Sequence, residues 1–137
     1  MSQLYDTLQI SSHGMRAQSM RVRVISENLA NAETLPSAPG ETPYQRQQIS
    51  FKNEMDRSLG FDVVRVDDVT TSQEEEFTLK YMPSHPAADE EGYVKAPKIA
   101  TLVEMMDVRE AQRSYEANIG MFDQSRSMIM RTIDLLR

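Results

Sequence analysis

Cysteine is absent from the 137-residue chain, and histidine is limited to His13 and His85. Without cysteine, the chain forms no disulfides, has no catalytic thiol and has no cysteine-based zinc site. No apolar run approaches the ~18 residues that a membrane-spanning helix needs, so we expect no direct membrane insertion. The N-terminus lacks a basic segment followed by an apolar stretch. We therefore expect no cleaved signal peptide, and export by another route if the protein works outside the cytoplasm.

The sequence also lacks the residue combinations that enzymes use. Ser11, Ser12 and His13 are adjacent on a predicted helix and cannot form a catalytic triad alone. His85 precedes the acidic residues 89–91, but one histidine with flexible carboxylates is a weak metal signal. No glycine-rich phosphate-binding loop is present. We therefore expect no catalytic residues, no metal site and no cofactor, and we predict that the protein is not an enzyme.

Negative charge is concentrated in the middle of the chain. The net charge is −6, and residues 59–95 hold nine acidic and three basic residues, whereas each flanking part holds six of each. Neutral ends can pack against copies of themselves without long-range repulsion, and an acidic middle suits a solvated surface. Neither end combines a basic patch with interleaved aromatic residues, so nucleic acid is not expected as a partner.

Proline divides the chain into three regions. All six prolines fall between residues 36 and 97, and each end holds one glycine. This distribution predicts an N-terminal helical arm over 1–33, a loop and β-rich middle segment over 34–96, and a C-terminal helical arm over 97–137. Within the arms we expect helices from Ser2 to Asn31 and from Pro97 to Leu136, because proline is common in a first helical turn.

Apolar residues recur along both arms at alternating spacings of four and three. Six of eight such positions in the first arm and eight of ten in the second are apolar, which is typical of a coiled-coil-like pair. We expect these fourteen residues to form an assembly interface: Leu4, Leu8, Met15, Val22, Ile25, Leu29, Met105, Val108, Tyr115, Ile119, Phe122, Ile129, Ile133 and Leu136.

The middle segment has the alternating pattern of β-strands. Phe77, Leu79 and Tyr81 alternate with polar residues, which predicts a half-buried strand, and two more strands are predicted from Tyr44 to Phe51 and over 61–66. We expect the acidic run Glu74–Glu76 to be solvated. The fold class is therefore α+β, with two long terminal helices and a small β-rich middle.

Further apolar residues lie beside the predicted stripes and leave two interpretations open. They line a monomeric helical hairpin packed on the β unit, or they contact other subunits, which we favour. These residues are Ala17, Met20, Val24, Leu102, Met106, Met121, Met128, Met130 and Leu135.

Two terminal segments resemble the motifs of flagellar rod and hook proteins: HGMRAQSMRVRVISENLANAET (13–34) and RSYEANIGMFDQSRSM (113–128). In the middle, YMPSHPAADEEGYVKAPKI (81–99) and EMMD (104–107) resemble the proximal-rod member of that family. The motif residues are Asn28, Leu29, Ala30, Asn31, Tyr115, Glu116, Ala117 and Asn118. For Asn28 and Asn31, helix capping and a fixed turn aimed at a neighbouring subunit both remain open.

The resemblance implies a structural subunit of the proximal rod in the bacterial flagellar basal body, located in the periplasmic space. It implies export by the flagellar type III apparatus and assembly through the terminal helices into a hollow, torque-transmitting axial structure. The implied partners are other copies of the chain, other rod proteins and the export apparatus. The alternatives are a neighbouring rod-family protein, or a soluble coiled-coil adaptor or export chaperone.

Overall fold

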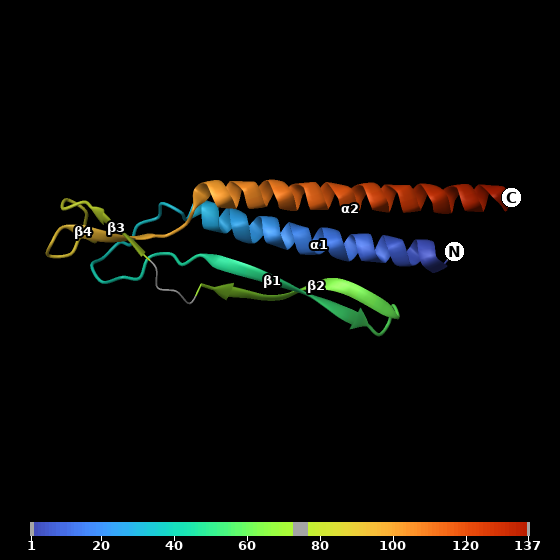
Figure 1. The fold of residues 1–137 in the computed structure, drawn as a ribbon, viewed down its shortest axis with the longest axis horizontal. Coiled ribbons are helices and arrows are strands. Elements are labelled where there is room, and N and C mark those ends of the chain that lie inside the picture. Colours follow the sequence, from blue (N-terminus) through green and yellow to red (C-terminus); the bar gives the residue numbers. More distant parts are fainter. Residues whose placement is uncertain (1, 73–76, 137) are drawn as a thin grey trace. The chain divides into compact units, whose positions relative to one another are not determined.

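The computed structural model describes residues 2–72 and 77–136, so the predicted acidic loop Glu74–Glu76 lies outside the described residues. Two long helices flank a β-rich middle, which confirms the predicted α+β class (Figure 1). The elements in chain order are α1 (Ser2–Ala30), β1 (Gln47–Asp56), β2 (Phe61–Thr71), β3 (Phe77–Tyr81), β4 (Tyr93–Pro97) and α2 (Thr101–Leu135). Neither helix, as far as it is described, combines the length and apolarity of a membrane span.

The chain divides into two compact units, each built from segments distant in sequence. The first contains Met1–Val22, Ile49–Asp68 and Val108–Arg137, and the second contains Arg23–Gln48 and Val69–Asp107. Each unit therefore combines part of α1, part of α2 and β structure. The two helices pass through both units.

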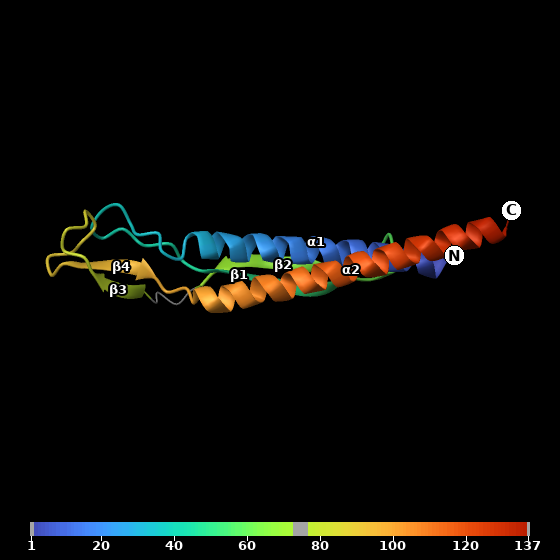
Figure 2. The same ribbon diagram turned by 90° about the horizontal axis from the view of Figure 1, so that it is seen from above.

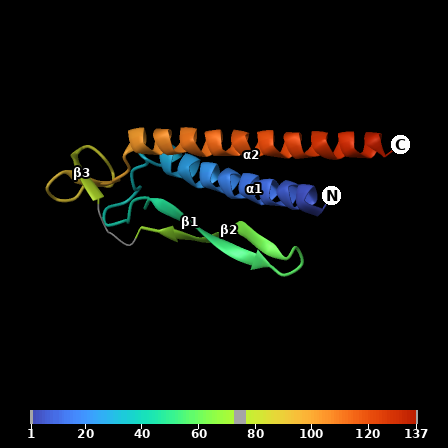
Figure 3. The same ribbon diagram turned by 45° about the vertical axis from the view of Figure 1, so that its right-hand side comes forward.

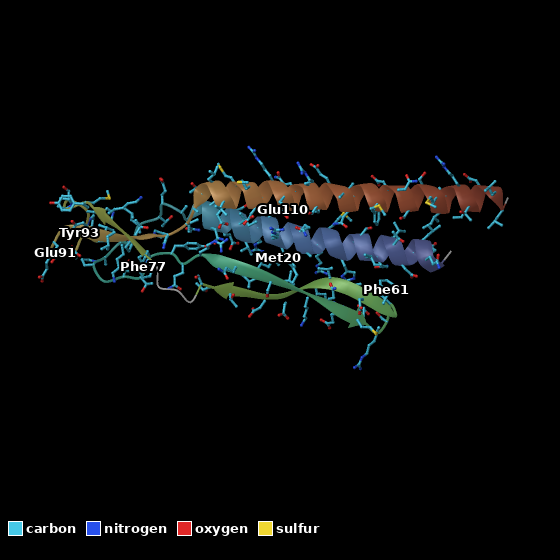
Figure 4. The ribbon with its side chains drawn as sticks, viewed as in Figure 1. Met20, Phe61, Phe77, Glu91, Tyr93 and Glu110 are labelled. Carbon is cyan, nitrogen blue, oxygen red and sulfur yellow. The ribbon has the colours of Figure 1, made fainter. Side chains whose placement is uncertain are left out.

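In the first unit, α1 lies between α2 and the β1–β2 hairpin (Figures 1 and 3). Ala17 of α1 is 2% exposed and Val63 of β2 is 1% exposed. Met20 lies on the hairpin side of α1 (Figure 4), where it lines a groove with Val64 and Val66. Burial of Ala17 and Val63 stabilises the hairpin against the helix.

The β1–β2 hairpin turns at residues 57–60, where Gly60 has a positive φ of 78°. Asp56 accepts hydrogen bonds from the Ser58 hydroxyl (2.5 Å) and N–H (2.9 Å), and Arg65 donates to its other oxygen (2.6 Å). These bonds to the charged form, those of Ser58 first, hold the pKa of the Asp56 carboxyl at about 2. These hydrogen bonds therefore hold the Asp56 carboxylate in place and keep it ionised.

In the second unit, β3 and β4 form an antiparallel pair in which Phe77 lies opposite Pro97, Leu79 opposite Lys95 and Tyr81 opposite Tyr93. Val94 and Ala96 of β4 are fully buried. The burial expected for β3 is wrong: Leu79 is 60% and Tyr81 66% exposed, and Thr78 and Lys80 on the other face are also exposed. Alternation identifies the two faces of a strand but not whether the fold covers either of them.

Several boundaries differ from those predicted. Strand β1 begins at Gln47 instead of Tyr44. Strand β2 continues to Thr71, because it pairs with β1. Helix α1 ends at Ala30, and α2 begins at Thr101 instead of Pro97. Pro97 instead ends β4, a strand that the sequence did not predict. Proline is tolerated at the edge of a sheet as well as at the start of a helix, so its position alone does not distinguish the two.

Candidate assembly interface

In the second unit, the side chain of Asn28 is 1% exposed and makes four hydrogen bonds. Its amide nitrogen donates to the Gln47 carbonyl (2.9 Å) and to the Glu104 carboxylate (3.3 Å). Its amide oxygen accepts from the Gln47 N–H (2.8 Å) and the Tyr44 hydroxyl (3.0 Å). These bonds use the full capacity of the amide. Asn28 therefore joins the end of α1 to residues 44–47 and to the first turn of α2.

Glu104 is the most deeply buried charged residue of this network. It is 1% exposed, and one carboxylate oxygen lies 2.6 Å from Nε of Arg46. Burial raises the pKa of the Tyr44 phenol, and the negative charges of Glu27 and Glu104 raise it further. The buried carboxylate is satisfied by a guanidinium partner and an amide donor. If the carboxylate or the guanidinium were removed, the charge left without its partner would be costly in free energy.

Asn31, the second asparagine of the motif, bonds locally. Its amide nitrogen donates to the Glu27 carbonyl (2.8 Å), and its own N–H donates to the same carbonyl (3.1 Å). Asn31 therefore caps the end of α1, as one of the two interpretations expected, whereas Asn28 does not. Both asparagines have negative φ, because the only positive φ values among the described residues belong to glycines.

In the first unit, α1 and α2 approach closely at Gly14. A Cβ atom added there would lie 2.8 Å from Oδ1 of Asn118, closer than side chains pack. The Asn118 amide donates to the Ser114 carbonyl (2.9 Å), which fixes its orientation. Seven residues further along α1, Arg21 lies 3.7 Å from Glu110, which lies on the side of α2 that faces α1 (Figure 4). The structure therefore places Asn118, a residue of the C-terminal motif, against α1 of the same chain.

We call the line of these contacts the α1–α2 seam. On α1 it passes through Gly14, Arg21 and Asn28, which are seven residues apart. On α2 the buried positions Glu104, Ala111 and Ser125, together with Asn118, are also multiples of seven apart. The seam residues are small or polar. A hydrophobic pattern therefore missed them and selected neighbouring positions such as Met15, Val22, Met105 and Ile119.

The fourteen predicted interface residues fall into three groups by burial. Ile25 (5% exposed) and Ile129 (7%) are buried within the chain. Half-buried are Leu4, Leu8, Met15, Val22, Leu29, Val108 and Phe122. Exposed are Met105, Tyr115, Ile119, Ile133 and Leu136. Whether the exposed group contacts other subunits stays a prediction.

The remaining motif residues lie mostly at the surface. Leu29 is half-buried, whereas Ala30, Glu116 and Ala117 are exposed. Tyr115 is 36% exposed and lines a shallow groove between α1 and α2 with Val22. Among the motif residues, Asn28, Asn31 and Asn118 therefore have the clearest structural roles within the chain.

Helix α2 exposes most of its large apolar side chains. Of the residues beside the stripes, Ala17 and Val24 are buried within the chain, which corrects the favoured interpretation for these two. The others are exposed: Met20, Leu102, Met106, Met121, Met128, Met130 and Leu135. An apolar surface of this kind, rimmed by charged residues, is typical of a protein–protein contact.

The histidines and carboxylates form no metal centre in the described part of the chain, where no three lie close enough to hold an ion. His85 accepts a hydrogen bond on Nδ1 from the Ala87 N–H (3.1 Å). His85 therefore stabilises its own turn.

Comparisons with known proteins point to one family. Residues 90–135 match the family described as flagellar basal body rod FlgEFG protein, C-terminal. The chain is 41% identical over 128 residues to "Flagellar basal-body rod protein FlgC" of Agrobacterium fabrum, covering 93% of the chain and 91% of the relative. It is 36% identical over 132 residues to the protein of that name in Salmonella typhimurium (96% and 97%). The corresponding protein of Bacillus subtilis is 30% identical over 146 residues (96% and 97%).

Paired terminal helices, a β-rich middle and a rod-protein C-terminal region define a structural protein of the bacterial flagellum. Similarity at this level over nearly the whole chain places it more narrowly. The chain belongs to the FlgC family of flagellar basal-body rod proteins, and it is a structural subunit of the flagellar basal body.

Proposed function

We propose that the protein is a subunit of the proximal rod that assembles, through α1 and α2, with further copies of itself and with other rod proteins. It leaves the cytoplasm through the flagellar type III apparatus without cleavage, and the assembled rod is a hollow structure in the periplasmic space that transmits torque. The protein has no catalytic activity of its own. The regions 1–33, 34–96 and 97–137 act as helical arm, middle segment and helical arm.

The exposed apolar residues of α2 carry this proposal. Met121 is 54% exposed and Met128 45%, while Ile129, next to Met128, is 7% exposed. Apolar side chains on one side of α2 are therefore buried within the chain, whereas those on another side remain exposed to water. Burying a large apolar side chain contributes about 1.5–3 kcal/mol, so covering this surface favours assembly. The neutral charge of both arms removes long-range repulsion between copies.

Charge substitution on the exposed side of α2 tests the proposal. Met121→Asp leaves the single chain folded, because the aspartate remains in water, but it places an unpaired charge in the assembled contact. We expect wild-type helicity by circular dichroism, loss of the variant from isolated basal bodies and loss of swimming in a strain that lacks the wild-type chain.

Met55 supplies the matched control, since this methionine of β1 is 62% exposed. Met55→Asp is expected to enter basal bodies and restore swimming. Normal incorporation of Met121→Asp would refute assembly through α2. An adaptor or export chaperone would instead form a stoichiometric complex with one partner and never enter the basal body.

A further inference from the structure

Methionine is the only sulfur-containing residue type of this chain, because cysteine is absent. With no thiol present, the thioethers are the side-chain groups that peroxides oxidise. Half of the ten methionines lie on α2, which is one unbroken helix (Figure 2), and Figure 4 shows sulfur atoms in yellow along it. All five are exposed: Met105 (52%), Met106 (64%), Met121 (54%), Met128 (45%) and Met130 (55%).

The contacts that hold α2 within the chain contain no sulfur. The seam positions of α2 are Glu104, Ala111, Asn118 and Ser125, and Ile129 is buried beyond them. Among the described residues, none of the buried ones is a methionine. Oxidation of the α2 methionines therefore leaves the seam and the buried residues chemically unchanged.

Met121 and Met128 lie seven residues apart, so they lie on the same side of α2. Both belong to the exposed surface that the proposed function assigns to assembly. Oxidation of methionine replaces a flexible apolar side chain with a polar sulfoxide, whose oxygen accepts hydrogen bonds. Water hydrates that oxygen in the free chain, whereas burial in an apolar contact leaves it without a donor and is costly. Oxidation therefore acts against assembly and not against the fold of the single chain.

We propose, on the basis of the proposed function, that Met121 and Met128 form a modification site at which oxidation by peroxide blocks assembly without unfolding the chain. At each residue the thioether sulfur attacks one oxygen of hydrogen peroxide, the O–O bond breaks and an S–O bond forms. The hydroxide that leaves removes the proton of the new S–OH group, which gives methionine sulfoxide and water. Sulfur loses two electrons and the peroxide gains two. Methionine sulfoxide reductases restore the thioether, so the modification is reversible.

The modification site is open only before assembly. In the free chain both thioethers are accessible to water and therefore to hydrogen peroxide. In the contact that the proposed function requires, the same side chains are covered by a neighbouring subunit. Peroxide therefore oxidises unassembled chains, and the sulfoxide is expected in that population and not in the basal body.

Co-expression of the wild-type chain and a Met121→Leu/Met128→Leu chain tests the proposal within one cell. Leucine keeps the apolar character and approximate volume of methionine but forms no sulfoxide. Cells are treated with hydrogen peroxide while new basal bodies form, and mass spectrometry then quantifies both chains and their sulfoxides in basal bodies and in the unassembled pool. Without peroxide we expect both chains to enter equally. Once most of the unassembled wild-type chain carries the sulfoxides, we expect an about tenfold preference for the leucine chain.

Met55 provides the matched control, because it is 62% exposed but lies on β1. A Met55→Leu chain is expected to be excluded after peroxide treatment as strongly as the wild-type chain. A second variant, Met121→Gln/Met128→Gln, places a polar amide at both positions without any oxidant. We expect it to have wild-type helicity by circular dichroism and about tenfold lower incorporation.

Normal incorporation of the glutamine variant, or its loss of helicity, would overturn the proposal. An unchanged ratio of the leucine and wild-type chains, while the unassembled pool carries both sulfoxides, would also overturn it, as would the absence of sulfoxide at residues 121 and 128 from that pool. Failure of the untreated wild-type chain to enter basal bodies would instead refute the proposed function itself.

Discussion

The side chain of Asn28 joins three segments that are far apart in sequence. It contacts residues 44–47 through Tyr44 and Gln47, and the first turn of α2 through Glu104. The Glu104 carboxylate and the Arg46 guanidinium complete the network. Because the network is buried and fully bonded, each member specifies the position of the others.

At the scale of this network we predict unequal effects for its two charged residues. Arg46→Met leaves the Glu104 carboxylate buried without its cation, which is expected to lower the free energy of unfolding by about 3–5 kcal/mol. Glu104→Gln keeps the shape and removes the buried charge, but its single amide oxygen can accept from only one of Arg46 and Asn28, so we expect it to cost about 1–2 kcal/mol. Urea denaturation followed by circular dichroism measures both.

The order of these two effects is the informative result. If Glu104→Gln destabilises the chain as much as Arg46→Met, the carboxylate depends on more than the Arg46 charge, and the account given for the network is wrong. Equal stability of both variants and the wild-type chain would show that the network does not form.

The two helices meet through small and polar residues, and this arrangement sets how closely they pack. Gly14 allows α1 to approach Asn118, while Ala111 and Ser125 are buried on α2 without projecting far. Polar residues at such positions specify register at some cost in stability. The large apolar residues are therefore left for other surfaces of α2.

At the scale of the helices we predict that the two helical glycines respond differently to alanine. Gly120 has open space at its Cβ position, so Gly120→Ala is expected to raise the free energy of unfolding by about 1 kcal/mol through helix propensity. At Gly14 the new methyl group displaces the Asn118 amide, which offsets that gain. Thermal or urea unfolding of the two variants measures the difference.

Equal stabilisation by both substitutions would contradict close approach of α1 and α2 at Gly14. Gly14→Val provides a stronger version of the same test, since a larger side chain overpacks the seam. We expect it to destabilise the chain by about 1–3 kcal/mol.

A single copy of this chain leaves much of α2 uncovered from its first turn to its last. Leu102 is 70% and Leu135 is 87% exposed, and Met121 between them is 54% exposed. An isolated helix is stabilised mainly by burial of its apolar face. The uncovered turns are therefore the least stable part of the helices in the free protein.

For the whole molecule we predict that assembly protects residues 130–136 of α2 more than the start of α1. In the free chain, amides of residues 130–136 are expected to exchange roughly tenfold faster than those near Ala111, because the large apolar side chains of this segment are exposed whereas Ala111 is buried. Leu4 and Leu8 are already half-buried within the chain. Hydrogen exchange of free protein and isolated basal bodies is expected to show the larger gain in protection at 130–136, and equal gains at both ends would contradict assembly through the exposed residues of α2.

Proline and glycine placement, together with long apolar repeats, determined two terminal helices around a β-rich middle, because these are local properties that act over neighbouring residues. Gly14 and Gly120 illustrate the limit: they are identical in sequence terms, and only the fold places one against Asn118 and the other in solvent. Strand β4 was missed because its five residues gain their structure from pairing with β3.

Tertiary structure alone decided which face of each helix is covered. The 4,3 spacing on α2 is consistent with two neighbouring stripes, and the chain buries the one that contains Glu104, Ala111 and Ser125. Burial there depends on the size and hydrogen bonding of partners far away in sequence, such as Asn28 and Arg46. Apolar pattern therefore identified surfaces to be buried, and the three-dimensional contacts determined which of them a single chain satisfies and which it leaves for its neighbours.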